Sequence, residues 1–264
     1  MVIDKNKLLI GIGIAGILAV SGIILAGYGK SPFAVESALN PENFSEKKTA
    51  NLRKFSDFPA SGGQGGCKDI IKSETARIEA YVVSQCPFGL QTQRVLANVV
   101  ESAPELADRI EVRYISSMAS GRLFSMHGEE EARENLRQIC AREEHAGKYW
   151  DYISCYIKKG DSAGCLSAAG ISAGSVEECA RDPLRGIKYA KEDIDLTSKH
   201  GIEGSPTILV NGNEISEFDF SGRNPESIKN IICCGFNNPP DACSATLINK
   251  EPATGFSETY LKSK

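Results

Sequence analysis

The residues best suited to chemistry lie in a short run, Ser84–Gly89, with the letters S-Q-C-P-F-G. Cys86 directly precedes Pro87, which fits the first turn of a helix because its missing N–H costs nothing there. A sulfur at a helix N-terminus faces unpaired backbone N–H groups and the positive end of the helix dipole, which favour the thiolate. The run predicts a nucleophile at Cys86, with Phe88 and Gly89 beside it. The alternative is a buried structural cysteine or half of a disulfide.

A second run, Gly204–Thr207, has the letters G-S-P-T and directly precedes an apolar stretch. Its Ser205–Pro206 bond is a candidate for the cis form, which in folded proteins is almost confined to X-Pro bonds. Taken alone, such a run is usually only a turn. We group Ser205 and Pro206 with Cys86 as candidate catalytic residues because of the elements around both runs.

The elements around these runs follow the order strand, helix, strand, helical region, strand, strand, helix. β-branched and aromatic residues predict the strands, and apolar residues at helical spacing predict the helices. The expected strands are 77–84, 109–115, 207–210 and 214–220, the expected helices are 87–101 and 225–233, and the helical region is about 120–200. The first strand, helix and strand predict a βαβ unit, with Cys86 at its strand-to-helix junction.

The composition narrows the class of protein. The chain has 264 residues, 41% hydrophobic and 24% charged, with a formal net charge of -4, as is usual for a folded globular protein. No basic stripe indicates a nucleic-acid partner. The three histidines are scattered and no CxxC pair occurs, so we expect no metal site and no cofactor.

An apolar segment near the start of the chain, 8–29, contains no charged residue. At about 1.5 Å per residue it is long enough to cross a bilayer core of about 30 Å. Lys5 and Lys7 precede it, which favours a cytoplasmic N-terminus. We expect a cytoplasmic tail at 1–7, a transmembrane anchor at 8–29 and a Pro- and Gly-containing linker at 30–72. A cleaved signal peptide is the competing interpretation.

All nine cysteines follow the apolar segment. That many cysteines without metal-ligand spacing indicate disulfides, which persist in oxidising compartments outside the cytoplasm. An odd count leaves at least one thiol unpaired or joined to another chain. We therefore expect a single-pass protein of the cell membrane, with its folded domain at 73–236 on the extracytoplasmic side and a C-terminal tail at 237–264.

Together, the two runs and the order of elements resemble the thioredoxin superfamily, particularly its DsbA-like branch with a helical insertion. In that superfamily the loop before the third strand lies beside the reactive cysteine and pairs with the substrate, which implies this role for Ser205 and Pro206. The implied fold is α/β, a thioredoxin-like domain with a helical insert at about 120–200, preceded by one transmembrane helix. The implied partners are proteins with thiols or disulfides.

A closer resemblance, over about 76–212, is to the gamma-interferon-inducible lysosomal thiol reductase family, whose motif reads C-Q-H-G-x2-E-C-x2-N-x4-C. The residues that match this motif in register are His127, Gly128, Glu131, Asn135 and Cys140. The later residues Cys155, Cys165, Gly170-Ile171-Ser172 and Glu178-Cys179 resemble the family's later cysteine pattern. We interpret His127 and Glu131 as structural residues that form caps and buried hydrogen bonds within the insert.

The chain departs from that family at positions that bear on the chemistry. The motif's first two cysteines are Ser125 and Ala132 here, as expected if those cysteines form one disulfide and are lost together. The family's reactive pair is CxxC, and Gly89 occupies its fourth position. Without that second thiol, Cys86 must be released by an external thiol, another cysteine or the substrate's own second thiol. A cysteine placed at 89 would lie one helical turn on and should restore dithiol activity.

The other eight cysteines are candidates for structural disulfides. The expected pairs are Cys155 with Cys165, Cys140 with Cys179, one of Cys233 and Cys234 with Cys243, and the other of those two with Cys67. Spacing alone does not decide these pairs, because four cysteines in the insert allow three connectivities. This arrangement leaves Cys86 free.

We expect a monothiol thiol-disulfide oxidoreductase or isomerase that acts on protein disulfides through Cys86 and depends on an external thiol or redox partner. Two alternatives stay open. The domain could be a redox-inactive binding or chaperone module, which Gly89 favours. It could also conjugate glutathione or isomerise a small molecule, although no clear site for the glutathione carboxylates is evident in the sequence.

The topology can be tested by adding a protease to intact cells whose outer layers have been permeabilised. If 8–29 stays in the membrane and the rest of the chain lies outside the cytoplasm, the protease should digest the domain. Full protection, with the domain recovered in the cytosol, would contradict this topology.

Overall fold

The protein is described by a computed structural model over residues 67–261. The tail at 1–7, the anchor at 8–29 and most of the linker at 30–72 lie outside the described residues. Within 67–261, no helix is both long and apolar enough to cross a bilayer.

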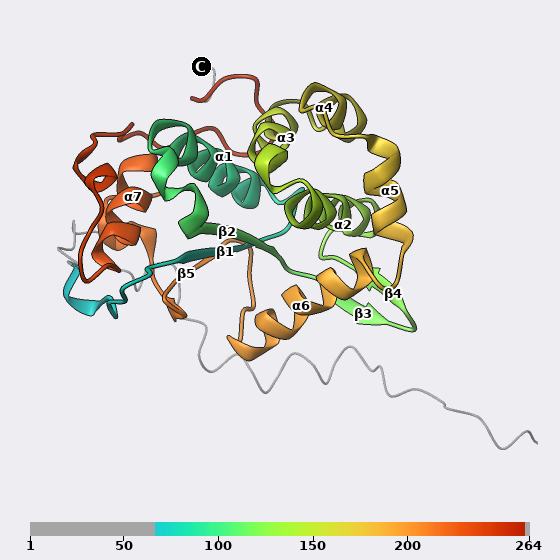
Figure 1. Cartoon of the computed structure of the whole chain (residues 1–264), viewed down its shortest axis with the longest axis horizontal. Helices are drawn as coiled ribbons and strands as arrows, with labels where there is room; N and C mark the ends of the chain where they lie inside the picture. Colours follow the sequence, from blue (N-terminus) through green and yellow to red (C-terminus); the bar gives the residue numbers. More distant parts are fainter. Residues whose placement is uncertain (1–66, 262–264) are drawn as a thin grey trace, which may run out of the picture. The chain divides into compact units, whose positions relative to one another are not determined.

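The helices and strands follow the predicted order, with two short strands added (Figure 1). In chain order they are β1 (Ile78–Val82), α1 (Pro87–Ser102), β2 (Ile110–Tyr114), β3 (Ser117–Ala119), β4 (Arg122–Phe124), α2 (Glu129–Glu144), α3 (Ala146–Lys159), α4 (Ser162–Ala168), α5 (Ala173–Arg181), α6 (Gly186–Lys199), β5 (Thr207–Val210), β6 (Asn213–Glu214) and α7 (Pro225–Cys234). Short 3-10 helices cover Cys67–Asp69, Pro104–Arg109, Glu217–Phe220 and Asp241–Ser244.

The central sheet has the strand order β2-β1-β5-β6. β1 and β2 are parallel, with Ile78 opposite Ile110, and α1 connects them, which confirms the βαβ unit. β5 is antiparallel to β1 and β6, and the turn after it has φ of 50° at Asn211 and 80° at Gly212. Two positive φ values are typical of two-residue hairpin turns and favour Asn-Gly. This strand order, with α7 after β6, is the thioredoxin-like arrangement.

Apolar side chains cover both faces of the sheet because successive residues of a strand point to opposite sides. Ile78, Ala80 and Val82 of β1 belong to the main core, together with apolar residues of α1 and α7. Tyr81 and Leu209 form a smaller cluster with residues at the end of α6 and after it. Figure 1 shows α1 and α7 on one side of the sheet and α6 on the other.

The sequence predicts mostly helical structure from about 120 onward, whereas the structure has the hairpin of β3 and β4 there. Ser120 and Gly121 have φ of 49° and 73° and form its tight turn. Each strand has three residues and no buried side chain, so it carries no apolar alternation. Only the Ser-Gly pair signals this turn in the sequence.

The strand expected at 214–220 was also too long. β6 ends at Glu214, and Glu217–Phe220 is a 3-10 helix. The Ser216 side chain accepts a hydrogen bond from the N–H of Phe218 at 3.3 Å. Serine competes for backbone groups in this way, so a local turn replaced the strand.

A buried ion pair closes the outer edge of β2. The N–H of Tyr114 donates to Asp193 of α6 at 2.9 Å, and Arg142 of α2 donates to the carbonyl of Val112. Arg142 and Asp193 also bond each other, at 2.9 and 3.0 Å. Burial lowers the pKa of the Arg142 guanidinium, but the charge of Asp193, the hydrogen bonds to it and the charge of Glu143 together raise that pKa above its usual value. The insert is thereby fixed to the sheet, and these edge groups have partners.

Disulfides join the insert and both ends of the described chain. They are Cys67–Cys234, Cys140–Cys179, Cys155–Cys165 and Cys233–Cys243. Two of them lie in the insert, where they join α2 to α5 and α3 to α4. The other two attach the segments before β1 and after α7 to α7 itself. Among residues 67–261, Cys86 is the cysteine left free.

The disulfide between α3 and α4 can be tested by replacing Cys155 and Cys165 together with serine. The two residues are ten apart in sequence, and a bridge that closes so short a loop contributes about 2–3 kcal/mol by restricting the unfolded chain. The melting temperature should fall, while the reactivity of Cys86 in the folded protein should stay unchanged. Loss of that reactivity at an unchanged melting temperature would show that the pair has another role.

Candidate active site

Cys86 occupies the N-cap of α1, at the junction of strand and helix. Its backbone is extended, with φ of -62° and ψ of 126°, and Pro87 takes the first helical position. The residue is 8% exposed. The first N–H groups of a helix have no partner within it, so the sulfur lies at the positive end of α1. A helix N-terminus is one of the places where reactive cysteines occur in proteins.

The loop before β5 lies against this sulfur. The Sγ of Cys86 lies 3.6 Å from the carbonyl oxygen of Ser205, and the Ser205–Pro206 bond is cis. On its other side, the Oγ of Ser205 accepts a hydrogen bond from the N–H of Val83 at 2.9 Å. Cys86 and Ser205 are 119 residues apart in sequence, yet their two runs form one site. In this site the sulfur of Cys86 lies next to the backbone carbonyl of Ser205.

Gly89 is packed so closely that the site has no room for a side chain there. A Cβ built on Gly89 would lie 2.7 Å from the carbonyl oxygen of Val83 and 2.9 Å from the Oγ of Ser205. The Val83 oxygen belongs to the backbone and cannot rotate away. The expectation that a cysteine at 89 would restore a dithiol stays a prediction, and it now carries a condition: the turn that carries Cys86 must shift to admit the Cβ.

The turn before Cys86 is held by side chains. Three consecutive backbone N–H groups, of Val83, Ser84 and Gln85, donate to Ser205 Oγ, Asn135 Oδ1 and Glu131 Oε1 at 2.9, 2.9 and 3.0 Å. The sequence predicts hydrogen bonds of Glu131 within the insert, and Glu131 makes these with Ser125 and His127. The sequence does not predict the hydrogen bonds from α2 to the turn before Cys86, because no local pattern encodes contacts between residues so far apart.

An exposed aromatic pair lies next to the site. Phe88 and Phe218 are 54% and 59% exposed, and the guanidinium of Arg223 lies 5.8 Å and 5.6 Å from their ring centres. Arg223 is itself fixed by Glu217 at 2.6 Å and by Gln91 at 3.1 Å. Phe218 and Arg223 carry no sequence signal of this role, since they lie in a turn far from the Cys86 run.

The C-terminal segment, expected to be a tail, lies against α1. The N–H of Gly255 donates to the carbonyl of Pro87 at 2.9 Å, directly after Cys86. Arg94 of α1 is buried and donates to the carbonyls of Ala253, Gly255, Ser257 and, on α3, Ile157. One guanidinium therefore joins the segment to two helices, α1 and α3.

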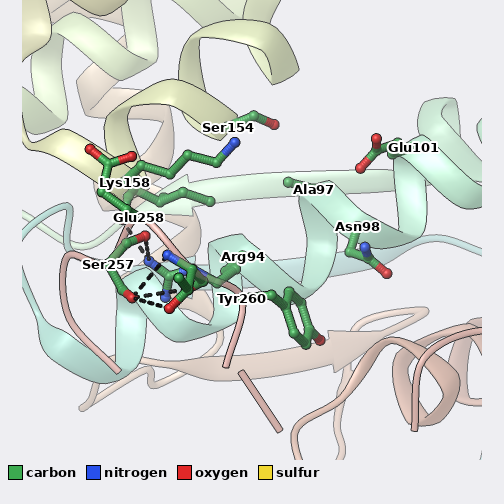
Figure 2. Close-up of a pocket in the computed structure, with 11 residues that line it drawn as sticks. Arg94, Ala97, Asn98, Glu101, Ser154, Lys158, Ser257, Glu258 and Tyr260 are labelled. Atoms are coloured by element: carbon green, nitrogen blue, oxygen red, sulfur yellow. Dashed lines mark hydrogen bonds between the residues drawn. The ribbon is translucent and has the colours of Figure 1, made fainter. Parts of the chain in front are cut away.

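A cavity of about 250 Å³ lies between α1, α3 and this segment (Figure 2). Figure 2 shows Arg94 bonded toward Ser257, with Lys158 above and Tyr260 beside it. Asn98 also lines the cavity, and its buried Oδ1 has no hydrogen-bond partner. Among residues 67–261, no group of three metal-ligating side chains gathers there or elsewhere.

No protein-family model and no curated protein matches this chain. Among solved structures, reduced DsbA from Mycobacterium tuberculosis is similar at 16% identity with a TM-score of 0.46, over 67% of this chain and 93% of that one. Oxidised BdbD from Bacillus subtilis has 16% identity and a TM-score of 0.42, over 62% and 89%. A putative protein disulfide isomerase from Nitrosomonas europaea has 12% identity and a TM-score of 0.42, over 60% and 96%. The fold assignment rests on strand order and connections.

The packing at Gly89 can be tested with Gly89→Ala. The added methyl group should lower the free energy of unfolding by about 1–3 kcal/mol, as overpacking does. Chemical denaturation measures this change.

Gly147→Ala is the matched control, because Gly147 also lies in the first turn of a helix and nothing is within 4 Å of its Cβ position. There, alanine should stabilise the helix by up to about 1 kcal/mol. Equal gains in stability at both positions would contradict the tight packing at Gly89.

Proposed function

We propose that this protein is a thiol-disulfide oxidoreductase or isomerase that acts on protein disulfides through a single reactive sulfur, Cys86. The observation that carries the proposal is the position of this free sulfur, at the N-terminus of α1 and 3.6 Å from the Ser205 carbonyl. Reactive cysteines in proteins often occupy this position at the start of a helix. The neighbouring carbonyl supplies a backbone group to which an extended substrate strand can bond.

The reaction begins when the Cys86 thiolate attacks one sulfur of a substrate disulfide. A bond forms between Cys86 and that sulfur, the substrate S–S bond breaks, and the other substrate sulfur leaves as a thiolate. If that thiolate, or another in the substrate, attacks the mixed disulfide, the substrate is released with rearranged pairing and no net redox change. If two external thiols act in turn, the substrate leaves as a dithiol and the external thiols leave as a disulfide.

Release by a second cysteine of the same site is not part of this proposal. Position 89 is glycine and has no room for a side chain. The other eight cysteines in 67–261 are bonded in pairs. The mixed disulfide should therefore be long-lived unless the substrate or an added thiol resolves it.

The exposed aromatic pair supports a polypeptide substrate. Phe88, two residues after Cys86, and Phe218 together offer exposed apolar surface, and the Arg223 guanidinium lies near both rings. Exposed apolar surface of this kind binds partners that present apolar side chains. Incompletely folded proteins, with disulfides and apolar residues both accessible, fit this description.

The membrane anchor at 8–29 and the extracytoplasmic location are part of the same proposal. Four disulfides in one domain are typical of proteins that fold in an oxidising compartment. The apolar length of 8–29 and the lysines before it support a single-pass anchor with the domain outside.

A binding or chaperone module is the second candidate. The observation that favours it is the low exposure of Cys86, 8%, combined with the lack of room for a second thiol at 89. In that case the aromatic pair would bind unfolded segments, and the sulfur would not turn over.

The test is trapping with a scrambled disulfide protein as substrate. The wild-type protein should form a disulfide-linked adduct and, with a small added thiol, catalyse rearrangement. Cys86→Ser should form no adduct and lose the catalysis. The Cys155→Ser/Cys165→Ser double variant is the control, because it removes two cysteines but keeps Cys86.

An unchanged activity in Cys86→Ser would place the nucleophile elsewhere and overturn the proposal. If the wild-type protein binds the substrate but neither forms an adduct nor exchanges disulfides, the binding module replaces the enzyme.

A further inference from the structure

The turn before Cys86 depends on two residues of α2. Glu131 and Asn135 are four residues apart, so their side chains lie on one face of the helix, one above the other. Both are fully buried. Their oxygens accept the N–H groups of Gln85 and Ser84 at 3.0 and 2.9 Å, two consecutive groups of the turn. The helix thereby presents two acceptors at the spacing that this turn requires.

Both carboxyl oxygens of Glu131 have hydrogen-bond partners. Oε1 accepts from the N–H of Gln85 and faces Nδ1 of His127 at 2.9 Å. Oε2 accepts from the Oγ of Ser125 at 2.7 Å and from the N–H of His127 at 2.9 Å. Each oxygen thus serves one backbone N–H. A glutamine, with one acceptor oxygen, cannot serve both, and it would leave a backbone N–H without a partner, which is costly.

Asn135 connects this turn to the end of the neighbouring strand. Its Oδ1 accepts from Ser84, and its Nδ2 donates to the carbonyl of Ile115 at 3.2 Å and to the Oγ of Ser125 at 3.1 Å. Ser84 follows β1 and Ile115 follows β2. The amide therefore links the loops at the carboxyl ends of two parallel strands, which is the edge where Cys86 lies.

We propose that Glu131 and Asn135 are positioning residues for Cys86, an inference that rests on the proposed function. They act through the peptide groups of Ser84 and Gln85 and fix the direction in which the Cys86 side chain leaves the turn. The bond within the turn itself, from the N–H of Cys86 to the carbonyl of Val83, is long at 3.3 Å. The side chains of α2, rather than the turn, set the position of the sulfur beside Ser205.

Replacing Glu131 should change the reaction rate of Cys86 in opposite directions, depending on whether the residue acts by positioning the turn or by its charge. Glu131 is a buried acidic residue that accepts from the N–H of Gln85, the residue before Cys86. Removing a negative charge would, by Coulomb's law alone, make a nearby thiolate easier to form and speed its reactions at low pH. Loss of positioning would instead slow the reaction at every pH, because the sulfur no longer meets the substrate disulfide in line.

The experiment measures the second-order rate constant of Cys86 with a dipyridyl disulfide, as a function of pH, in the full-length protein. Glu131→Gln should lower this rate constant about tenfold across the pH range in which near-ultraviolet circular dichroism shows a folded protein. Glu130→Gln is the matched control, since the neighbouring Glu130 side chain is 70% exposed, and its rate constant should match that of the wild type. Cys86→Ser identifies the signal that comes from Cys86.

Each outcome decides between defined alternatives. If the wild-type protein reacts no faster than Cys86→Ser, the proposed function fails, whatever Glu131 does. If the wild-type protein reacts and Glu131→Gln reacts equally fast or faster, the positioning role is wrong and the residue is merely structural. If Glu131→Gln does not fold, His127→Ala replaces it: the exposed ring is removed, one bond to Oε1 is lost, and the rate constant should fall about two- to threefold. An unchanged rate constant there overturns the proposal.

Discussion

The backbone N–H groups between β1 and α1 are the constraint around which this domain is organised. A turn from strand to helix leaves such groups without regular partners, and burying them unpaired is costly. Here the groups of Val83, Ser84 and Gln85 are satisfied by the loop before β5 and by α2. These acceptors come from α2, near the start of the insert, and from the loop that follows the insert, so both must be in place before the turn is complete.

The same constraint accounts for the missing second thiol. The Oγ of Ser205 that accepts from Val83 also occupies the space next to Gly89, within 2.9 Å of where a Cβ would lie. A turn held in this way leaves no volume for a side chain at 89. The Ser205 Oγ that accepts the hydrogen bond from Val83 therefore also favours glycine at 89, and the site keeps a single sulfur.

The sequence predicts most of the sheet and α1 because their signals are local. Alternation in Ile110–Tyr114 and the Asn211-Gly212 turn each depend on a few neighbouring residues. The contacts of Asn135 with Ser84 and of Glu131 with Gln85 join residues 51 and 46 apart, so periodicity carries no trace of them. The same holds for Arg94, which joins α1 to residues about 160 positions later. Local patterns therefore predict the helices and strands, whereas the contacts that hold the turn before Cys86 join residues far apart in sequence and cannot be predicted from such patterns.

The disulfide Cys67–Cys234 has a consequence for how the chain matures. Its cysteines are 167 residues apart, whereas Cys155 and Cys165 are ten apart. A chain that emerges from its N-terminus exposes Cys67 and then Cys86 long before α7 is made. The two early sulfurs are each other's first available partners in an oxidising compartment. In the oxidising compartment that we propose for this domain, Cys86 would stay a thiol only if the two sulfurs were kept apart or separated later, so the order of synthesis would matter as well as the final fold.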